Sequence, residues 1–260
     1  MNKTSTPPPG LTDDGFLGHC LKVLQPEKGY RAGIDAVMLA AAVPAMAGER
    51  VLDLGAGVGV ASLCLAARCD GVGVTGLEVQ PDLVATATEN AARNALAAHV
   101  SFVEGSLDEK AAALEAKRVP YGGFDHVMTN PPYYEDGKVW TPPDPGKATA
   151  HALGEVDLET WLRVTCSMAR PRGTVTIVHR MDALPALLAG VGRWLGALVA
   201  FPLWPAEGEP AGRVLLQGIK GSRAPFSLSP GLVLHEKEGG FAAAASAVLR
   251  DGAPLPLSSA

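Results

Sequence analysis

The chain has 260 residues, enough for one large domain or two small ones. Apolar residues make up 47% of it and charged residues 19%, a globular composition that excludes a mostly disordered, fibrous or coiled-coil protein. The formal net charge of −5 argues against a protein that binds nucleic acid over its whole surface, and it leaves room only for a local basic patch.

Cysteine usage and the chain ends indicate the compartment. The cysteines have neither the spacing of a zinc site nor that of a disulfide framework, which predicts reduced thiols and no bound metal; they are Cys20, Cys64, Cys69 and Cys166. No apolar leader or membrane-length apolar run is present, so we expect no membrane contact and a cytoplasmic protein. Residues 1–10 are predicted to be a disordered tail, because their Pro-Pro-Pro-Gly sequence cannot continue a helix or a sheet.

From about residue 48 the chain alternates short strand-like runs with longer helical runs. The expected strands are residues 51–54, 72–78, 100–105, 124–130, 173–179, 197–204 and 213–221, and the expected helices between them are 60–69, 81–96, 156–169 and 181–195. Such alternation is typical of a parallel sheet covered by helices, whereas the short connection before the last strand predicts an antiparallel pair. We therefore expect an α/β fold with a seven-stranded, mostly parallel sheet and an antiparallel last strand.

A single domain with three parts is expected. The parts are a core at 48–221, an N-terminal segment at 11–47 that packs on the ligand site, and an extension of the same domain at 222–260, with a short strand at 232–236 and a helix at 242–250. Residues 131–150 interrupt the alternation with five prolines and no periodicity. A long irregular segment of this kind is a candidate functional loop.

A glycine-rich loop joins the first strand of the core to the first helix. It reads Asp53, Gly55, Gly57 and Gly59 in a G-x-G-x-G spacing, which differs from the dinucleotide and P-loop patterns. Glu78 ends the next strand, where its carboxylate would lie beside the loop and accept hydrogen bonds from ribose hydroxyls. A ribose without a pyrophosphate fits these features, and the acidic Asp53 favours a cation. S-adenosylmethionine, with its sulfonium and ammonium groups, satisfies both requirements.

Asn130-Pro131-Pro132-Tyr133 follows directly on the fourth expected strand, at the sheet edge where open α/β folds bind ligands. The Asn130 side chain and the Pro131 main chain each offer a carbonyl oxygen, and Pro132 stiffens the turn that holds them. Tyr133 can stack on a planar ring. This arrangement predicts catalysis by acceptors placed around a planar amine, with positive charge developing on its nitrogen.

Together, these motifs resemble those of the class I S-adenosylmethionine-dependent methyltransferases, and Asn-Pro-Pro-Tyr is similar to the motif of the branch that methylates planar nitrogens. The block Gln25-Pro26-x-x-Gly29-Tyr30-Arg31-x-x-x-Asp35-x-x-x-Leu39-Ala40 narrows the resemblance. With it, residues 12–250 resemble the bacterial tRNA (adenine-N6)-methyltransferases that modify the adenosine beside the anticodon of a valine tRNA.

The resemblance implies a Rossmann-like class I methyltransferase fold and methyl transfer from S-adenosylmethionine to adenine N6, with S-adenosylhomocysteine as product. It also implies that Tyr30 and Asp35 belong to the cofactor pocket, together with the glycine loop, Glu78 and Asn130. In related enzymes an Asp after the third strand commonly binds the cofactor adenine. Here Ser106 stands at that position and Asp108 follows it, so both remain candidates.

Basic residues gather in the segments expected around the site. They are Lys22, Lys28 and Arg31 before the glycine loop and Lys138 and Lys147 after Tyr133, with Trp140 among them. If these segments flank the mouth of the site, they form a local basic rim for RNA, most simply the tRNA that the resemblance implies.

Other functions remain open from the sequence. They are methylation of guanine N2 in ribosomal RNA or of a protein glutamine, and cofactor binding without catalysis. Glutamine methyltransferases of this kind usually carry a helical N-terminal domain, for which a sheet beginning near residue 50 leaves no room. His151 and His179 are predicted to be packing residues rather than catalytic ones.

Overall fold

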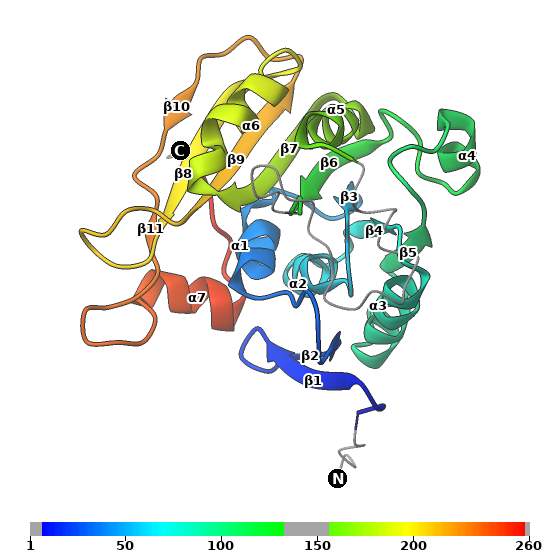
Figure 1. The fold of residues 1–260 in the computed structure, drawn as a ribbon, viewed down its shortest axis with the longest axis horizontal. Coiled ribbons are helices and arrows are strands. Elements are labelled where there is room, and N and C mark those ends of the chain that lie inside the picture. The colour runs from blue at the N-terminus through cyan, green and yellow to red at the C-terminus, as the bar shows by residue number, and fades with distance from the viewer. Residues whose placement is uncertain (1–6, 133–155, 258–260) are drawn as a thin grey trace.

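The computed structural model describes residues 7–132 and 156–257, and its centre is a twisted sheet with helices on both faces (Figure 1). The strands lie in the order β10-β8-β9-β7-β6-β3-β4-β5, and β11 pairs with β8 beside β10. Seven long strands carry the sheet: β3 (Arg50–Leu54), β4 (Gly73–Glu78), β5 (Val100–Glu104), β6 (Phe124–Thr129), β7 (Ala169–Arg180), β8 (Leu195–Trp204) and β9 (Arg213–Lys220).

The strand directions match the prediction. β5, β4, β3, β6 and β7 are mutually parallel, and β9 runs antiparallel between β7 and β8. The α/β fold with seven mostly parallel strands and an antiparallel last strand is therefore confirmed. Two short strands widen the sheet to nine among the described residues: β10 (Ser227–Leu228) and β11 (Leu232–Val233), both parallel to β8. The expected strand at 232–236 is thus shorter than predicted.

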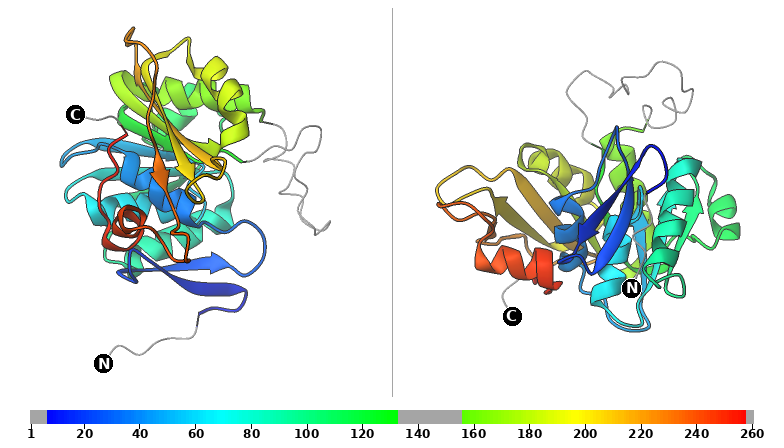
Figure 2. Two further views of the ribbon diagram at one scale, coloured as in Figure 1. Left: turned by 90° about the vertical axis from the view of Figure 1, so that its left-hand side faces the viewer. Right: turned by 90° about the horizontal axis from the view of Figure 1, so that it is seen from below.

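Two groups of helices cover the two faces of the sheet (Figure 2). One face carries α1 (Ile34–Ala42), α2 (Val60–Arg68), α3 (Pro81–Arg93) and α7 (Ala243–Asp251). The other carries α4 (Ala111–Ala116), α5 (Leu158–Met168) and α6 (Leu184–Val191), the last preceded by the short turn η2 (Met181–Ala183). Each face therefore has its own apolar core.

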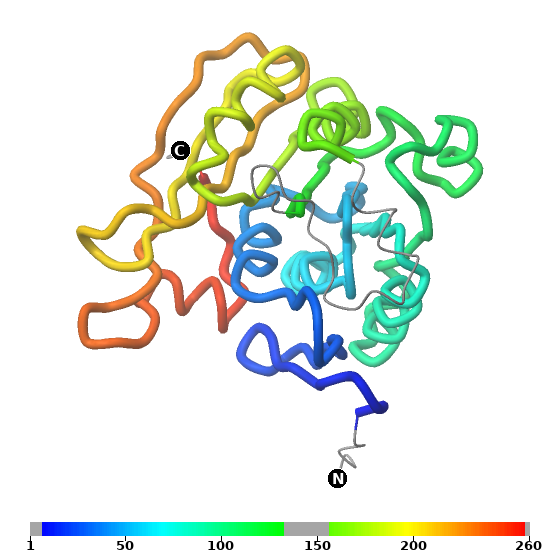
Figure 3. The backbone as a smooth tube through the Cα atoms, in the orientation of Figure 1, coloured from blue at the N-terminus to red at the C-terminus, as the bar shows by residue number. Residues whose placement is uncertain are grey.

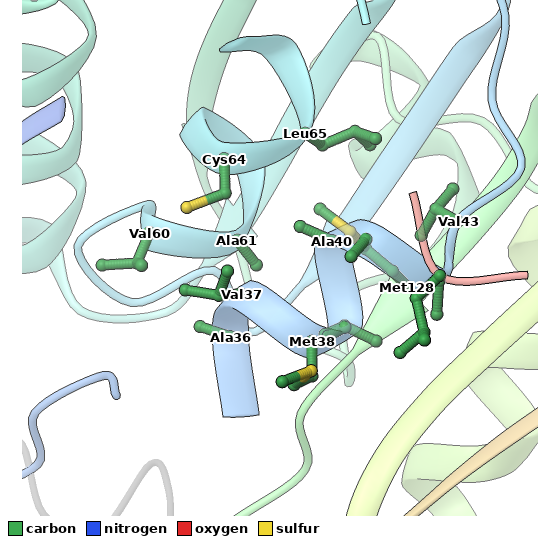
Figure 4. Close-up of a cluster of buried hydrophobic side chains, with 14 of the residues drawn as sticks. Ala36, Val37, Met38, Ala40, Val43, Val60, Ala61, Cys64, Leu65 and Met128 are labelled. Carbon is green, nitrogen blue, oxygen red and sulfur yellow. The ribbon is translucent and has the colours of Figure 1, made fainter. Parts of the chain in front are cut away.

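Small side chains allow α1 and α2 to pack closely. Ala40 on α1 and Ala61 on α2 lie in a cluster completed by Val37, Leu65 and the β6 residue Met128 (Figure 4). Close packing of apolar side chains is the main stabilising term of such a layer. Helix α2 follows the glycine loop directly. The contact between α1 and α2 therefore holds the N-terminal segment next to that loop.

An N-terminal hairpin lies outside the main sheet, next to α3, as the blue end of the tube in Figure 3 shows. It consists of β1 (Leu11–Phe16) and β2 (Leu21–Pro26), paired antiparallel from Leu11 opposite Pro26 to Phe16 opposite Leu21. The expected elements included neither this hairpin nor helix α1.

Within the described residues no helix is long and apolar enough to cross a membrane, and no group of three potential metal ligands is found. The four cysteines are free thiols, with Cys64 and Cys166 buried in the two cores.

Candidate functional site

The glycine loop turns the chain from β3 into α2 with left-handed backbone at three positions: Gly55, Gly57 and Gly59 have φ of +76°, +56° and +86°. A Cβ at Gly59 would meet the Phe102 ring at 2.4 Å, so a side chain is excluded there by packing as well as by backbone geometry. A Cβ at Gly57 would meet no heavy atom within 4 Å. Gly57 therefore borders open space in which a ligand can approach the backbone closely.

Two adjoining hollows open at this loop, and Gly55 lines both. The first, which we call the Glu78 pocket, holds about 400 Å³ of empty space; it is lined by Glu78, Val79, Ser106, Leu107, Val156 and Trp161 among others. The second, the Asn130 pocket, holds about 510 Å³; it is lined by Tyr30, Ala36, Asp53, Gly57, Leu83 and Asn130 among others. One elongated ligand could occupy both hollows across the loop.

The Glu78 carboxylate is held in a fixed orientation at the end of β4. Its Oε2 accepts a hydrogen bond from the Gly57 N–H at 2.9 Å and its Oε1 accepts one from the Gln80 N–H at 3.0 Å, and the residue is only 6% exposed. A carboxylate oxygen has more than one acceptor site, so each can still receive a hydroxyl from the pocket. The glycine loop is thus hydrogen-bonded directly to Glu78, the residue predicted to accept the ribose hydroxyls.

Asp53 is buried at the end of β3 beneath the Asn130 pocket, with 2% of its surface exposed. Ser62 Oγ donates to its Oδ2 at 2.7 Å. Burial raises the pKa of Asp53 to about 6, the Ser62 hydrogen bonds oppose this rise, and the charge of Glu78 adds to it. A cation in the pocket would favour the charged carboxylate.

Asn130 and Tyr30 both line the Asn130 pocket and contact each other there, although 100 positions separate them in the sequence. Asn130 Nδ2 donates to the Tyr30 hydroxyl at 2.9 Å, whereas Asn130 Oδ1 is buried and has no hydrogen-bond partner among the described residues. Desolvation of the hydroxyl, and then the charges of Asp35 and Asp53, raise the pKa of Tyr30 to about 12. Tyr30 is therefore a neutral phenol at physiological pH.

The Gln25 to Asp35 block owes its shape to side-chain contacts. The Gln25 side chain accepts from the Ala32 N–H at 2.8 Å and donates to the Ala32 carbonyl at 3.3 Å. Arg31 bonds the Asp14 carboxylate at 2.6 Å and the Pro26 carbonyl at 3.0 Å. These bonds hold the turn from which Tyr30 projects.

Asp35 lies in the first turn of α1 and forms an ion pair with Arg213 of β9, with 2.9 Å between the carboxylate and Nε. It is not among the residues that line the two pockets. Of the two candidates after β5, Ser106 lines the Glu78 pocket and Asp108 is exposed outside it.

The remaining predicted residues are placed only in part. Lys22 and Lys28 are exposed near the hairpin, and Arg31 is engaged with Asp14. Pro131 is buried directly after Asn130. His179 is buried, and burial lowers its pKa to about 4, which makes it neutral at pH 7. Tyr133, Lys138, Trp140, Lys147 and His151 lie outside the described residues.

Trp161 lines the Glu78 pocket and was not predicted from the sequence. Its Nε1 donates to Thr129 Oγ1 at 2.9 Å, and Thr129 Oγ1 donates to the Leu54 carbonyl at 2.7 Å. Its ring also fills the space beside Gly55, where a Cβ would approach it to 2.8 Å. No local sequence pattern predicts this role, because it depends on α5 packing next to the glycine loop.

Known proteins resemble the chain in sequence. Residues 32–142 match the model of the methyltransferase small domain. A tRNA1(Val) (adenine(37)-N6)-methyltransferase of Bacteroides fragilis is 31% identical over 59% of this chain. The match spans 61% of that relative's own length. A protein of the same name from Shewanella amazonensis is 26% identical over 86% of this chain and 91% of its own length.

Solved structures show the same architecture. A predicted O-methyltransferase from Agrobacterium tumefaciens superposes with a TM-score of 0.71 at 27% identity, over 85% of this chain and 98% of its own. The predicted resemblance to class I methyltransferases is confirmed. At 15% identity, a Pyrococcus horikoshii protein solved in complex with MeSAdo shares the fold, with a TM-score of 0.54 over 82% of this chain and 72% of its own. Both pockets lie at the carboxyl edge of the parallel strands, because Glu78 ends β4 and Asn130 follows β6.

Proposed function

We propose that this protein transfers a methyl group from S-adenosylmethionine to N6 of an adenine in tRNA. The observation that carries the proposal is the Asn130 Oδ1 atom, a buried acceptor without a partner among the described residues, in a residue that lines the pocket adjoining the Glu78 pocket. Such an atom costs free energy unless a ligand donor reaches it. The names of the sequence relatives support adenine as that donor.

The two pockets fit the parts of the cofactor. Glu78 would accept the ribose hydroxyls, and Ser106 would face the adenine between the apolar side chains of Val79 and Leu107. Across the glycine loop, the open space at Gly57 and the buried carboxylate of Asp53 suit the cationic methionine end. When bound there, S-adenosylmethionine supplies an electrophilic methyl group.

The acceptors at the end of β6 would prepare the amine for attack. An adenine amine is a poor nucleophile because its lone pair is delocalised into the ring. If its two N–H groups donate to Asn130 Oδ1 and the Pro131 carbonyl, the nitrogen is held with its lone pair toward the methyl group, and the positive charge that develops is stabilised. After transfer, the surplus amine proton leaves to solvent through the open pocket.

The tRNA would approach over the N-terminal segment. Residues 11–47, which we take to pack on the site of the 48–221 core, carry Tyr30 into the Asn130 pocket and place Lys22 and Lys28 at the surface nearby. An adenosine in an anticodon loop is already partly unstacked, so moving it into a pocket costs less than extracting it from a duplex.

The test is mass spectrometry of nucleosides from tRNA incubated with the protein and S-adenosylmethionine. We expect N6-methyladenosine with the wild-type protein and a loss of at least about a hundredfold with Asn130→Ala, since an electrostatic acceptor of the transition state is worth about that much. Asn94→Ala, the same substitution at the C-cap of α3 and outside both pockets, is the matched control and should retain activity.

The other products separate the alternatives. Appearance of N2-methylguanosine would move the substrate to guanine, and methylation of a glutamine in a protein pool would move it to protein. Tight cofactor binding with no methyl transfer to any RNA or protein would refute the proposed reaction and leave a binding module.

A further inference from the structure

The Asn130 side chain can serve as an acceptor in only one of its two orientations. Its amide ends are nearly equal in shape but opposite in hydrogen bonding, because Oδ1 accepts and Nδ2 donates. With Oδ1 toward the pocket, the side chain complements an amine. After a half-turn, Nδ2 would face the N–H groups of that amine, donor against donor. Some contact must therefore select the orientation.

The contact in the structure is the hydrogen bond from Asn130 Nδ2 to the Tyr30 hydroxyl at 2.9 Å. It occupies the donor end of the amide and leaves Oδ1 without a partner among the described residues. The carboxylates of Asp35 and Asp53 act on the same hydroxyl. A hydroxyl can also donate, but these negative charges attract its hydrogen and leave its oxygen to accept from Nδ2.

Tyr30 itself is held by its backbone rather than by packing of its ring, which leaves the residue 59% exposed. The two hydrogen bonds between Gln25 and Ala32 close the turn after Tyr30, and the Arg31 bonds to Asp14 and Pro26 brace it. Gln25 is only 2% exposed, so this brace is buried. The contacts of Gln25 and Arg31 thus fix the backbone on both sides of Tyr30 and, with it, the position of the Tyr30 hydroxyl.

We propose that the Tyr30 hydroxyl is a positioning group that sets the orientation of the Asn130 amide, so that Oδ1 faces the substrate amine. The inference rests on the proposed function, because it assigns Tyr30 a task in the same reaction. Tyr30 does not exchange a proton with the substrate. It acts through Asn130 alone.

Tyr30→Phe is the direct test. Without the hydroxyl, Nδ2 loses its hydrogen-bond acceptor in the protein, so no contact selects the reactive orientation over the turned one. We expect kcat to fall about tenfold while KM for S-adenosylmethionine and the Kd of S-adenosylhomocysteine change less than about threefold, the size expected from one hydrogen bond. Tyr121→Phe removes a hydroxyl from an exposed turn away from both pockets and should change nothing.

The same substitution in an Asn130→Asp background separates a positioning role of Tyr30 from a general disturbance of the site. In Asn130→Asp both side-chain oxygens accept, so orientation no longer matters, and adding Tyr30→Phe should then cost less than about threefold. An equal loss of kcat in both backgrounds, or no loss in the first, would overturn the inference while the proposed function stands.

A measurement without turnover covers the remaining case. The Asn130 side-chain NH₂ signals, assigned in ¹⁵N spectra through their disappearance in Asn130→Asp, should shift in Tyr30→Phe and stay in place in Tyr121→Phe. If wild-type protein methylates no tRNA, the proposed function fails. The spectra then test only the contact between Tyr30 and the Asn130 amide: unshifted signals overturn it, and shifted signals support it.

Discussion

At the scale of single residues, the site contains a buried carboxylate that lowers the stability of the fold. Asp53 lies almost wholly buried at the end of a central strand, and its only side-chain donor in the described structure is Ser62. Burial of a charged group costs free energy unless partners compensate it. The raised pKa of Asp53, about 6, is the consequence. In the proposed function the missing compensation comes from the cationic cofactor.

This burial predicts a pH-dependent stability difference between wild type and Asp53→Asn. A carboxyl whose pKa rises from 3.8 unfolded to about 6 folded binds more protons in the folded state. Its contribution to stability is therefore present below about pH 4 and is lost as pH rises through 6. At about 1.4 kcal/mol per pKa unit, the loss is about 3 kcal/mol.

We expect Asp53→Asn, which keeps an acceptor for Ser62, to gain stability relative to wild type by up to about 3 kcal/mol between pH 4 and pH 7. Urea unfolding of both proteins across that range measures the difference. A difference that stays constant with pH would show that Asp53 does not titrate in this window.

The sequence was sufficient to predict the site residues whose position depends only on where a strand ends. Asp53, Glu78 and Asn130 lie within one residue of the carboxyl end of a parallel strand, and such strand ends meet at one edge of the sheet. The contacts that orient these residues were not predictable. The Tyr30 bond to Asn130 and the Arg213 bond to Asp35 join residues 100 and 178 positions apart, and no local pattern specifies such pairs.

At the scale of elements, α3 binds the N-terminal hairpin as a further strand would. Asn90 accepts from the Leu24 N–H at 2.8 Å and donates to the Leu24 carbonyl at 3.0 Å. One helical turn later, Asn94 forms the same pair of bonds with Lys22, at 2.9 and 2.8 Å. Two side-chain amides thus satisfy the edge of β2 that faces away from β1. Asn90 also donates to the Val58 carbonyl in the glycine loop, which couples the hairpin to the site.

Removing the inner amide should therefore cost more than removing the outer one. Asn90 is fully buried, and Asn90→Ala leaves three backbone groups without their partner, so we expect it to lower the free energy of unfolding by about 2–4 kcal/mol. Asn94→Ala, whose bonds to Lys22 are exposed, should cost about 1 kcal/mol or less. Urea titration of the two variants measures both, and equal costs would contradict the role given to Asn90.

The same contacts explain why the hairpin escaped prediction. The β1 sequence LTDDGF has two acidic residues and a glycine, which are disfavoured in strands. Its ion pairs, Asp13 with Arg93 and Asp14 with Arg31, supply stability from outside the strand. Helix α1 has seven consecutive buried residues and hence no polar face to reveal a helical period. From β3 onward, alternating strands and helices have local signatures, and the seven long strands agree with the expected ones. The short elements α4 and β10 were not expected, and α6 is shorter than the helix expected at 181–195.

At the scale of the whole molecule, the negative charge limits how RNA can bind. The net charge is −5, and several cations near the carboxyl edge are already paired. Arg31 bonds Asp14, Arg180 bonds Asp182 and Arg213 bonds Asp35. A cation held by a carboxylate contributes less to phosphate binding than an unpaired one. Under the proposed function, recognition then depends on a few local contacts and on the pocket.

This limit predicts a shallow salt dependence of tRNA affinity. Each phosphate contact contributes about −0.7 to −0.9 to the slope of log K against log salt concentration, so the five basic residues of the predicted rim give a slope no steeper than about −4.5. Lys28→Ala should make the slope shallower by about one, and Arg172→Ala, at the opposite edge of the sheet, should leave it unchanged. Fluorescence anisotropy with labelled tRNA from low to physiological salt measures both. A slope equivalent to about eight or more released counterions would require a continuous basic surface, which a chain of this charge and pairing does not provide.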